Sequence, residues 1–122
     1  MVKLLVYIAG KYWEKTIGAR LANTHKMIDV GIELYKKSHC DLVPYIPTWT
    51  HWMEERMDYN GEPKKPNEWW YEFDNVFLPK CSALIKISER GNSKGADLEE
   101  DLAESLGIPV YFTVDECIKG MI

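Results

Sequence analysis

A carboxylate in the C-terminal third of the chain stands among apolar neighbours, where it could do chemistry. Written as a helix with about 100° per residue, the segment there places Leu98, Leu102 and Leu106 in one apolar stripe, which Ala103 widens on one side, with Glu99 projecting from inside it. We expect the other acids of the segment on the opposite, solvated side; they are Asp97, Glu100, Asp101 and Glu104. Burying a carboxylate without a partner costs several kcal/mol. Glu99 is therefore either satisfied by fixed donors, such as a tyrosine or backbone groups, or held for chemistry.

Asp74 is a second carboxylate of this kind. It is the only charge on a helical face made of Trp70, Phe73, Phe77, Leu78 and Cys81. Because burial disfavours the charged form, such a face predicts a raised pKa for Asp74, which suits a general acid. The alternative is a packing ion pair with Arg20, Arg56 or Lys11.

Alternating strand and helix patterns supply the elements that must position these acids. Buried strands are expected at 3–9, 41–46, 83–87 and 110–114, and helices at 15–38, 68–80 and 96–106. Residues 48–68 contain turn signals around a short amphipathic stretch, Trp49 to Met57. The alternation predicts one α/β domain over 1–122, with a three-layer, flavodoxin- or Rossmann-like fold and a parallel sheet of four or five strands.

The helix over 15–38 is predicted because mostly apolar side chains recur on one of its faces. That face carries Ile17, Leu21, Thr24, Ile28, Ile32 and Tyr35.

Ligands of open parallel sheets bind outside the carboxyl ends of the strands, so the loops after the strands are candidate binding segments. Gly10 and Lys11 follow the first strand. Ser93 and Gly95 lead into the Glu99 helix, whose first N–H groups can hold a phosphate. The loop has no Walker spacing, and no GxGxxG follows the first strand. Ser93 is equally suited to be only a helix cap, and Lys11 to be a solvated loop lysine.

Two further side chains have alternative interpretations. Tyr7, near the end of the first strand, is either a core residue or a hydrogen-bond donor to Glu99 or a bound sugar. His51, next to Trp49 and Trp52, either stacks on or hydrogen-bonds a base, or is an ordinary surface histidine.

The tryptophans, Trp13 excepted, lie between Trp49 and Trp70, which favours either aromatic lids over a base or a dimer interface. No spacing of histidines, cysteines and acids resembles a metal site, and no cofactor is expected.

Three short segments resemble the nucleoside 2-deoxyribosyltransferase-like superfamily, which includes the deoxynucleoside monophosphate N-glycosidases. Tyr7-Ile8-Ala9-Gly10 is similar to the end of its first strand. Asp74, Leu78 and Cys81-Ser82-Ala83-Leu84-Ile85 resemble its Asp-containing helix and the strand that follows. The Ser-x-Gly-x-x-x-Glu segment and the spacing after it are matched by Ser93, Gly95, Glu99, Ala103, Gly107 and Pro109.

The resemblance implies an enzyme that acts on the N-glycosidic bond of a nucleotide or nucleoside. Glu99 would be the nucleophile that forms a glycosyl ester, Asp74 the acid that protonates the departing base, and Ser93 a contact to a 5′-phosphate. The implied activity is that of a nucleoside 5′-monophosphate N-glycosidase. The alternatives are a deoxyribosyltransferase and a nucleotide sensor without turnover. Family members commonly form homodimers or larger homo-oligomers.

Composition narrows the class of partner. The 122 residues, 46% of them hydrophobic, suffice for one core, and the formal charge of −4 with a pI near 5.4 argues against a nucleic-acid surface. The apolar run Leu4 to Ala9 is too short for a signal or a membrane span. Three scattered cysteines without a CxxC favour free thiols, so we expect a cytoplasmic protein without a membrane partner.

Overall fold

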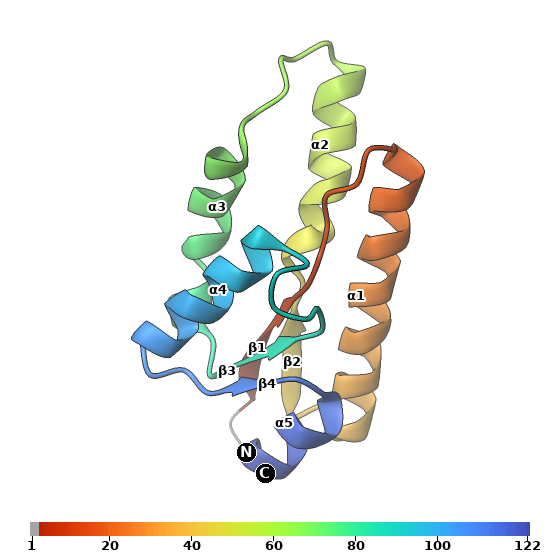
Figure 1. The fold of residues 1–122 in the computed structure, drawn as a ribbon. Coiled ribbons are helices and arrows are strands. Elements are labelled where there is room, and N and C mark those ends of the chain that lie inside the picture. Colours follow the sequence, from red (N-terminus) through yellow and green to blue (C-terminus); the bar gives the residue numbers. More distant parts are fainter. Residues whose placement is uncertain (1–2) are drawn as a thin grey trace.

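The computed structural model describes residues 3–122 and shows an α/β fold built on a four-stranded, all-parallel sheet (Figure 1). The strand order is β2-β1-β3-β4, and β1 pairs with β2 in the register Leu4 to Leu42 and with β3 in the register Val6 to Ala83. The strands are β1 (Leu4–Ala9), β2 (Leu42–Tyr45), β3 (Ala83–Lys86) and β4 (Val110–Tyr111). The three-layer, Rossmann-like fold expected from the sequence is confirmed.

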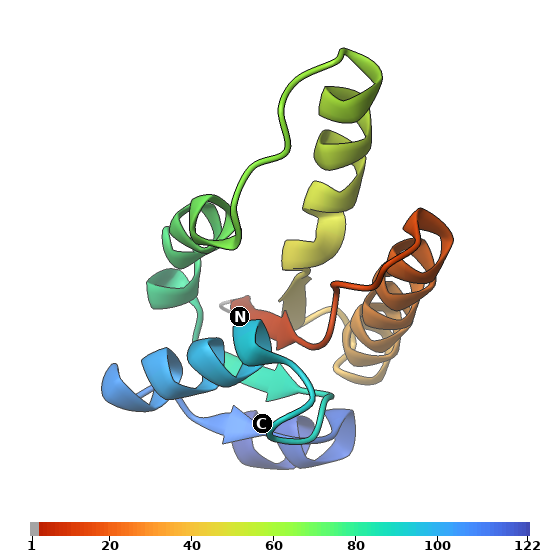
Figure 2. The same cartoon turned by 45° about the horizontal axis from the view of Figure 1, so that its top comes forward.

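Helices lie on both faces of the sheet. They are α1 (Ile17–Lys37), α2 (Thr50–Tyr59), α3 (Asn67–Asn75), α4 (Lys94–Ser105) and α5 (Val114–Met121). In Figure 1, α1 and α5 flank one face and α4 the other, while α2 and α3 rise beyond the carboxyl ends of the strands. Figure 2 shows the loop between α2 and α3 standing away from the sheet. Within residues 3–122, no helix combines the length and the apolar character that crossing a bilayer requires.

Alternation along β1 divides the interior into two layers. Val6 and Ile8 face α1 and α5, where they pack with Met27 and Leu34. On the other side, Tyr7 and Ala9 pack with Leu78, Cys81, Leu84, Ala96 and Ala103. Because side chains of a strand point alternately to opposite faces, one strand serves both layers. Tyr7 thereby faces α4.

The buried face of α4 matches the expected apolar stripe in part, since Ala103 is buried and Leu102 packs against the core. Leu98 and Leu106 are 45% and 48% exposed, whereas Ala96 and Ala103 are fully buried. Glu100, expected in solvent, is 8% exposed, so that expectation was wrong. Two alanines let the helix approach the sheet closely, and Lys86 of β3 supplies a counter-charge for Glu100.

The same partial match occurs in α1. Thr24 of the expected face is buried and Ile28 packs against the core, but Ile17 and Ile32 of that face remain about half exposed. The other buried residues of α1 are Met27, Gly31 and Leu34. At Gly31 a Cβ would lie 2.9 Å from the Ile46 side chain, closer than real Cβ contacts allow. The glycine thus brings α1 against the segment after β2, and the face with the small residue is the one that packs.

Two element boundaries differ from the sequence-based expectation. The helix expected over 68–80 ends at Asn75, and a single 3-10 turn, Leu78–Lys80, contains Pro79, which has no N–H to continue an α-helix. The last strand is only two residues long, because Thr113 caps α5 by accepting a hydrogen bond from the Glu116 N–H.

Candidate active site

Glu99 and Asp74 line the same cavity, of about 260 Å³, beyond the carboxyl ends of β1 and β3. The walls of the cavity come from the loop after β1, the first turn of α1, residues 47–54, the loop between α2 and α3, the helix α3, the loop after β3 and the first turns of α4. Among its lining residues are Gly10, Lys11, Trp13, Trp70, Tyr71, Ser93 and Gly95. The expectation that loops after the strands bring these residues to one place therefore agrees with the geometry.

Glu99 is held by the strand in the centre of the sheet. The Tyr7 hydroxyl donates a hydrogen bond to Glu99 Oε2, so Tyr7 is both fully buried core and a partner of this acid. Burial raises the pKa of Glu99 to about 8, against the lowering effect of the Tyr7 hydrogen bond and with a further increase from the Asp74 charge. The carboxyl thus keeps a proton at a pH where an exposed glutamate has lost it.

Asp74 is less well satisfied than Glu99. Burial raises the pKa of Asp74 to about 7, while the nearby Tyr45 hydroxyl lowers it. Within residues 3–122, Asp74 Oδ1 is buried and has no hydrogen-bond partner. The ion pairs considered for it do not form, since Arg20 pairs with Glu54 at 3.1 Å and Lys11 with Glu14 at 2.9 Å, while Arg56 lies over the Tyr59 ring. This carboxyl is therefore free to meet a ligand.

The loop before α4 combines a capped helix start with a close helix contact. Ser93 is the N-cap of α4, its Oγ accepting a hydrogen bond from the Ala96 N–H at 3.2 Å, so the capping interpretation is confirmed. Ser93 still lines the cavity. At Gly95 a Cβ would lie 3.1 Å from the Tyr71 ring, which shows how closely α4 approaches α3. Tyr71 was not anticipated from the sequence.

Gly10 and Lys11 both line the cavity, but they differ in their surroundings. A Cβ at Gly10 would lie 2.8 Å from the Ile87 side chain, so the packing of the core requires a glycine at this position, which also lines the cavity. Lys11 lies at the cavity edge, exposed and paired with Glu14.

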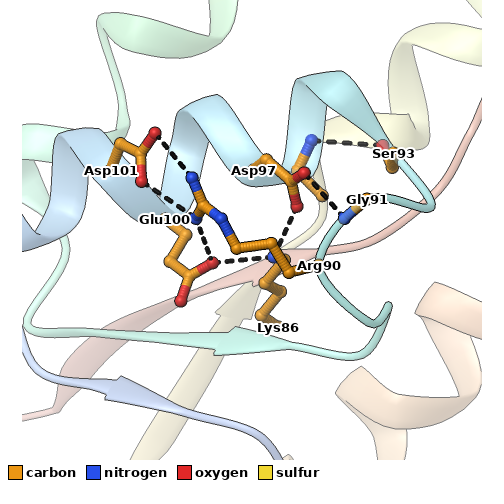
Figure 3. A network of polar contacts seen from close by, with 8 residues as sticks. Lys86, Arg90, Gly91, Ser93, Asp97, Glu100 and Asp101 are labelled. Carbon is orange, nitrogen blue, oxygen red and sulfur yellow. Dashed lines mark hydrogen bonds and ion pairs between the residues drawn. The ribbon is translucent and has the colours of Figure 1, made fainter.

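A buried ion-pair network fixes α4 on the sheet (Figure 3). Lys86, 2% exposed, places its Nζ 2.6 Å from Asp97 Oδ1 and 2.7 Å from Glu100 Oε1. Arg90 bridges Glu100 and Asp101, and the Gly91 N–H donates to Asp97. Because Glu99 lies between Asp97 and Glu100 in sequence, these contacts set the rotation of α4 that turns Glu99 towards Tyr7. The only sequence signal for the network is a lysine that ends an apolar strand.

Replacing Lys86 by methionine is expected to lower the free energy of unfolding by about 3–5 kcal/mol, because it leaves Asp97 and Glu100 without their buried partner. Urea unfolding followed by circular dichroism measures this. The matched control is Arg90→Met, whose side chain is 58% exposed, and which should cost less than about 1 kcal/mol. Equal losses for the two variants would contradict a dominant role of Lys86.

His51 does not reach the cavity of Glu99 and Asp74. It is 2% exposed, which overturns the interpretation as a surface histidine, and it lines a second compartment of about 390 Å³. Its Nδ1 lies 2.9 Å from the Tyr12 hydroxyl, which also donates to Glu54. A base bound beside Glu99 would therefore not stack on His51.

No family model, curated protein or solved structure matches this chain. Across residues 3–122, no group of three or more histidine, cysteine and acidic side chains is placed to hold a metal ion. The chemistry open to the site is that of the carboxyls of Asp74 and Glu99, with Glu54 paired to Arg20, and of its tyrosines and lysines.

Proposed function

We propose that the protein cleaves the N-glycosidic bond of a nucleoside 5′-monophosphate, with Glu99 as the nucleophile. One observation carries this proposal: two carboxyls with raised pKa values line one cavity at the carboxyl edge of the sheet. Enzyme sites are where such perturbed acids concentrate, and a pair of carboxyls is the machinery of retaining glycosyl transfer. The resemblance of the sequence to N-glycosidases and deoxyribosyltransferases supports the same chemistry.

The proposed reaction has two steps. The reacting form has Glu99 ionised and the proton of the pair on Asp74, which is the minority arrangement because Glu99 has the higher pKa. In this form an oxygen of Glu99 attacks the anomeric carbon while the bond from that carbon to the base nitrogen breaks, and Asp74 gives its proton to the departing base. A glycosyl ester on Glu99 results. Asp74, now ionised, then takes a proton from a water molecule that attacks the same carbon, which releases the sugar phosphate and restores the Glu99 carboxylate.

Tyr7 supports the first step by its contact with Glu99. Its hydroxyl donates to one carboxylate oxygen, Oε2, and so orients the other towards the cavity. Burial and the charges of Glu99 and Asp74 raise the pKa of Tyr7 far above its ordinary value, so the hydroxyl keeps its proton. Tyr7 is accordingly a donor throughout the reaction and never a base.

The other residues that line the cavity suit the phosphate and the base of a nucleotide. Ser93, Gly95 and the neighbouring N–H groups at the start of α4 would receive the 5′-phosphate, together with Lys11. Lys94 also lines the cavity and forms no salt bridge with any described residue. Trp13, Trp70 and Tyr71 provide aromatic surface for the base.

A panel of nucleoside 5′-monophosphates tests the proposal. We expect free base to appear by chromatography, and a slow 2-fluoro sugar analogue to leave a covalent adduct on Glu99 in a peptide mass spectrum. The matching nucleosides without phosphate serve as the control for the phosphate site. Release of base without any adduct would favour direct attack by water, and no release from any member of the panel would refute the proposal. Sugar transfer to an added second base would identify the transferase branch instead.

We further propose that a second copy of the chain completes the site. The surface of η1 (Pro47–Trp49) and α2 exposes large apolar side chains, with Trp49, Trp52 and Met53 each more than 40% exposed. Aromatic residues and methionine are enriched at the centres of protein interfaces. Sedimentation velocity of the purified protein, with Trp52→Lys as the disrupting variant, measures the oligomeric state.

A further inference from the structure

The second compartment borders the cavity of Glu99 and Asp74. The two share a wall, and at about 390 Å³ the second is larger than the first. The shared wall is formed by Tyr12, Arg20, Glu54, Lys64, Lys65 and Trp70. Neither Glu99 nor Asp74 lines the second compartment. A group bound there therefore lies away from the reacting carbon, so the compartment is unsuited to an attacking acceptor.

The shared wall is cationic. Arg20, Lys64 and Lys65 face a single acid, Glu54, which Arg20 already pairs. Lys64 and Lys65 form no salt bridge with described residues and instead lie over the rings of Trp13 and Trp69. Two lysines without counter-ions between two compartments favour an anionic group that passes from one to the other.

Beyond the shared wall the sign of the charge changes. The residues that line only the second compartment include Glu55, Asp58 and Glu62 but one basic side chain, Lys15. A further phosphate would be repelled there. The same walls offer aromatic and apolar contacts through His51, Met57 and Ile17. An uncharged ring system with hydroxyl groups suits this combination better than a polyphosphate tail.

His51 provides a buried polar atom in the second compartment that a ligand could hydrogen-bond. The ring is 2% exposed, Nδ1 is engaged with Tyr12, and Nε2 is buried without a hydrogen bond to any described residue. Glu55 lies 3.3 Å from that nitrogen and is itself half exposed, so it can be displaced into solvent. Buried polar atoms generally have partners, and a ligand hydroxyl or ring nitrogen would supply one.

We infer that the protein's substrate is a dinucleotide, two nucleosides joined by a pyrophosphate, that spans both compartments. This inference rests on the proposed N-glycosidase function, for which a 5′-monophosphate would be the smallest substrate. The reacting nucleoside and its 5′-phosphate occupy the cavity of Glu99 and Asp74 as proposed above. The second phosphate crosses the wall of Lys64 and Lys65, and the second nucleoside lies beside His51 and Tyr12. The bond that breaks is unchanged.

The experiment compares the affinities of two probes, adenosine 5′-monophosphate and diadenosine 5′,5′-pyrophosphate, by calorimetry on Glu99→Gln protein, which holds ligands without turnover. We expect the dinucleotide to bind at least about tenfold more tightly, since it gains the contacts of a second stacked ring. A dinucleotide that binds no more tightly than the monophosphate would overturn the inference.

A pair of variants on α1 locates the extra affinity. Ile17, half exposed, lines the second compartment, and Ile32, equally exposed on the same helix, does not. In the Glu99→Gln background, Ile17→Trp should fill the compartment and reduce the ratio of the two affinities to about one. Ile32→Trp should leave the ratio unchanged. A ratio that Ile17→Trp does not alter would also overturn the inference.

The result is separable from the proposed function, because base release is measured independently on the unmodified protein. If base is released from monophosphates and dinucleotide with equal kcat/KM and Ile17→Trp changes neither, the dinucleotide inference fails and the N-glycosidase proposal stands. If the dinucleotide binds through the second compartment but no base is released, the N-glycosidase proposal fails and the binding inference stands.

Discussion

Replacing Glu99 by glutamine is expected to lower the rate of base release from nucleoside 5′-monophosphates by roughly 10⁴-fold or more, the scale on which loss of a nucleophile usually acts. The amide has the shape of the carboxylate but no anionic oxygen to bond with the anomeric carbon. Its carbonyl oxygen can still accept the Tyr7 hydrogen bond, so the fold should survive. Chromatographic measurement of free base under single-turnover conditions gives the rate.

The matched control for this substitution is Glu104→Gln. Glu104 lies on the same helix, α4, but is exposed to solvent and does not line the cavity. Its replacement should change the rate by less than about twofold, in keeping with surface substitutions away from a site. If Glu99→Gln released base as fast as the unmodified protein, the nucleophile would have to be another group, and the assignment of Glu99 would be withdrawn.

Replacing Asp74 by asparagine is expected to reduce kcat by about 10²- to 10⁴-fold, the usual contribution of a general acid. Asparagine cannot give a proton to the departing base. Substrates whose base is already a good leaving group should lose less, because they need that proton less. A comparison of such a nucleotide with an ordinary one separates loss of acid catalysis from loss of binding. Asp29→Asn, on the exposed side of α1, is the control.

The pKa values of the two acids predict how the rate of base release depends on pH. The pKa values of about 7 for Asp74 and about 8 for Glu99 belong to acids in one cavity, so the pair holds a single proton between these values. Below this range Glu99 is protonated and cannot attack, and above it neither acid retains a proton for the base. The rate should therefore rise towards pH 7 and fall above pH 8.

In Asp74→Asn the profile should change on both sides. The decline above pH 8 should disappear, because it reports loss of the last proton of the pair, and in the variant Glu99 is active once it has lost its own proton. The rise at low pH should follow the ionisation of Glu99 alone, whose pKa remains raised by burial. A variant profile identical in shape to that of the unmodified protein would show that Asp74 takes no part in proton transfer.

Much of this architecture could be predicted from the sequence because it follows from patterns with strong physical constraints. Strands that alternate with helices must form parallel pairs, and parallel strands place their following loops at one edge of the sheet. That argument alone brought Gly10 and Ser93 to the same cavity. Asp74 and Glu99 stood out because a charge among apolar side chains is costly wherever it is buried.

The choice of the buried helix face was only partly right. Ala103 of α4 and Thr24 of α1 are buried as expected, whereas the larger Leu98 and Ile17 are not. A stripe of leucines has more apolar surface than a stripe of alanine and glycine, yet α4 packs through Ala96 and Ala103, and α1 through Gly31. Small residues permit a close approach that no single-helix pattern reveals, because the gain depends on the partner surface. The burial of Glu100 was unpredictable for the same reason, since it needs Lys86 from a strand to be known as its neighbour.

His51 and the second compartment lay beyond sequence reasoning as well. The contact of His51 with Tyr12 joins α2 to the loop after β1, across 39 positions of sequence. Nothing in the local pattern around either residue signals the pairing. A turn-rich stretch between two strands predicts only that the chain leaves the sheet and returns, and the shape it encloses depends on the full set of long-range contacts.

The unpartnered oxygen of Asp74 affects the stability of the protein without a ligand. A buried acceptor without a donor costs a folded protein about 1–3 kcal/mol, which is a noticeable share of the margin that keeps a domain of this size folded. Replacing Asp74 by an apolar residue of similar shape should raise the free energy of unfolding of the protein without a ligand. A ligand that donates a hydrogen bond to this oxygen removes that cost, so the free energy of unfolding should be lower for the empty protein than for the ligand-bound protein.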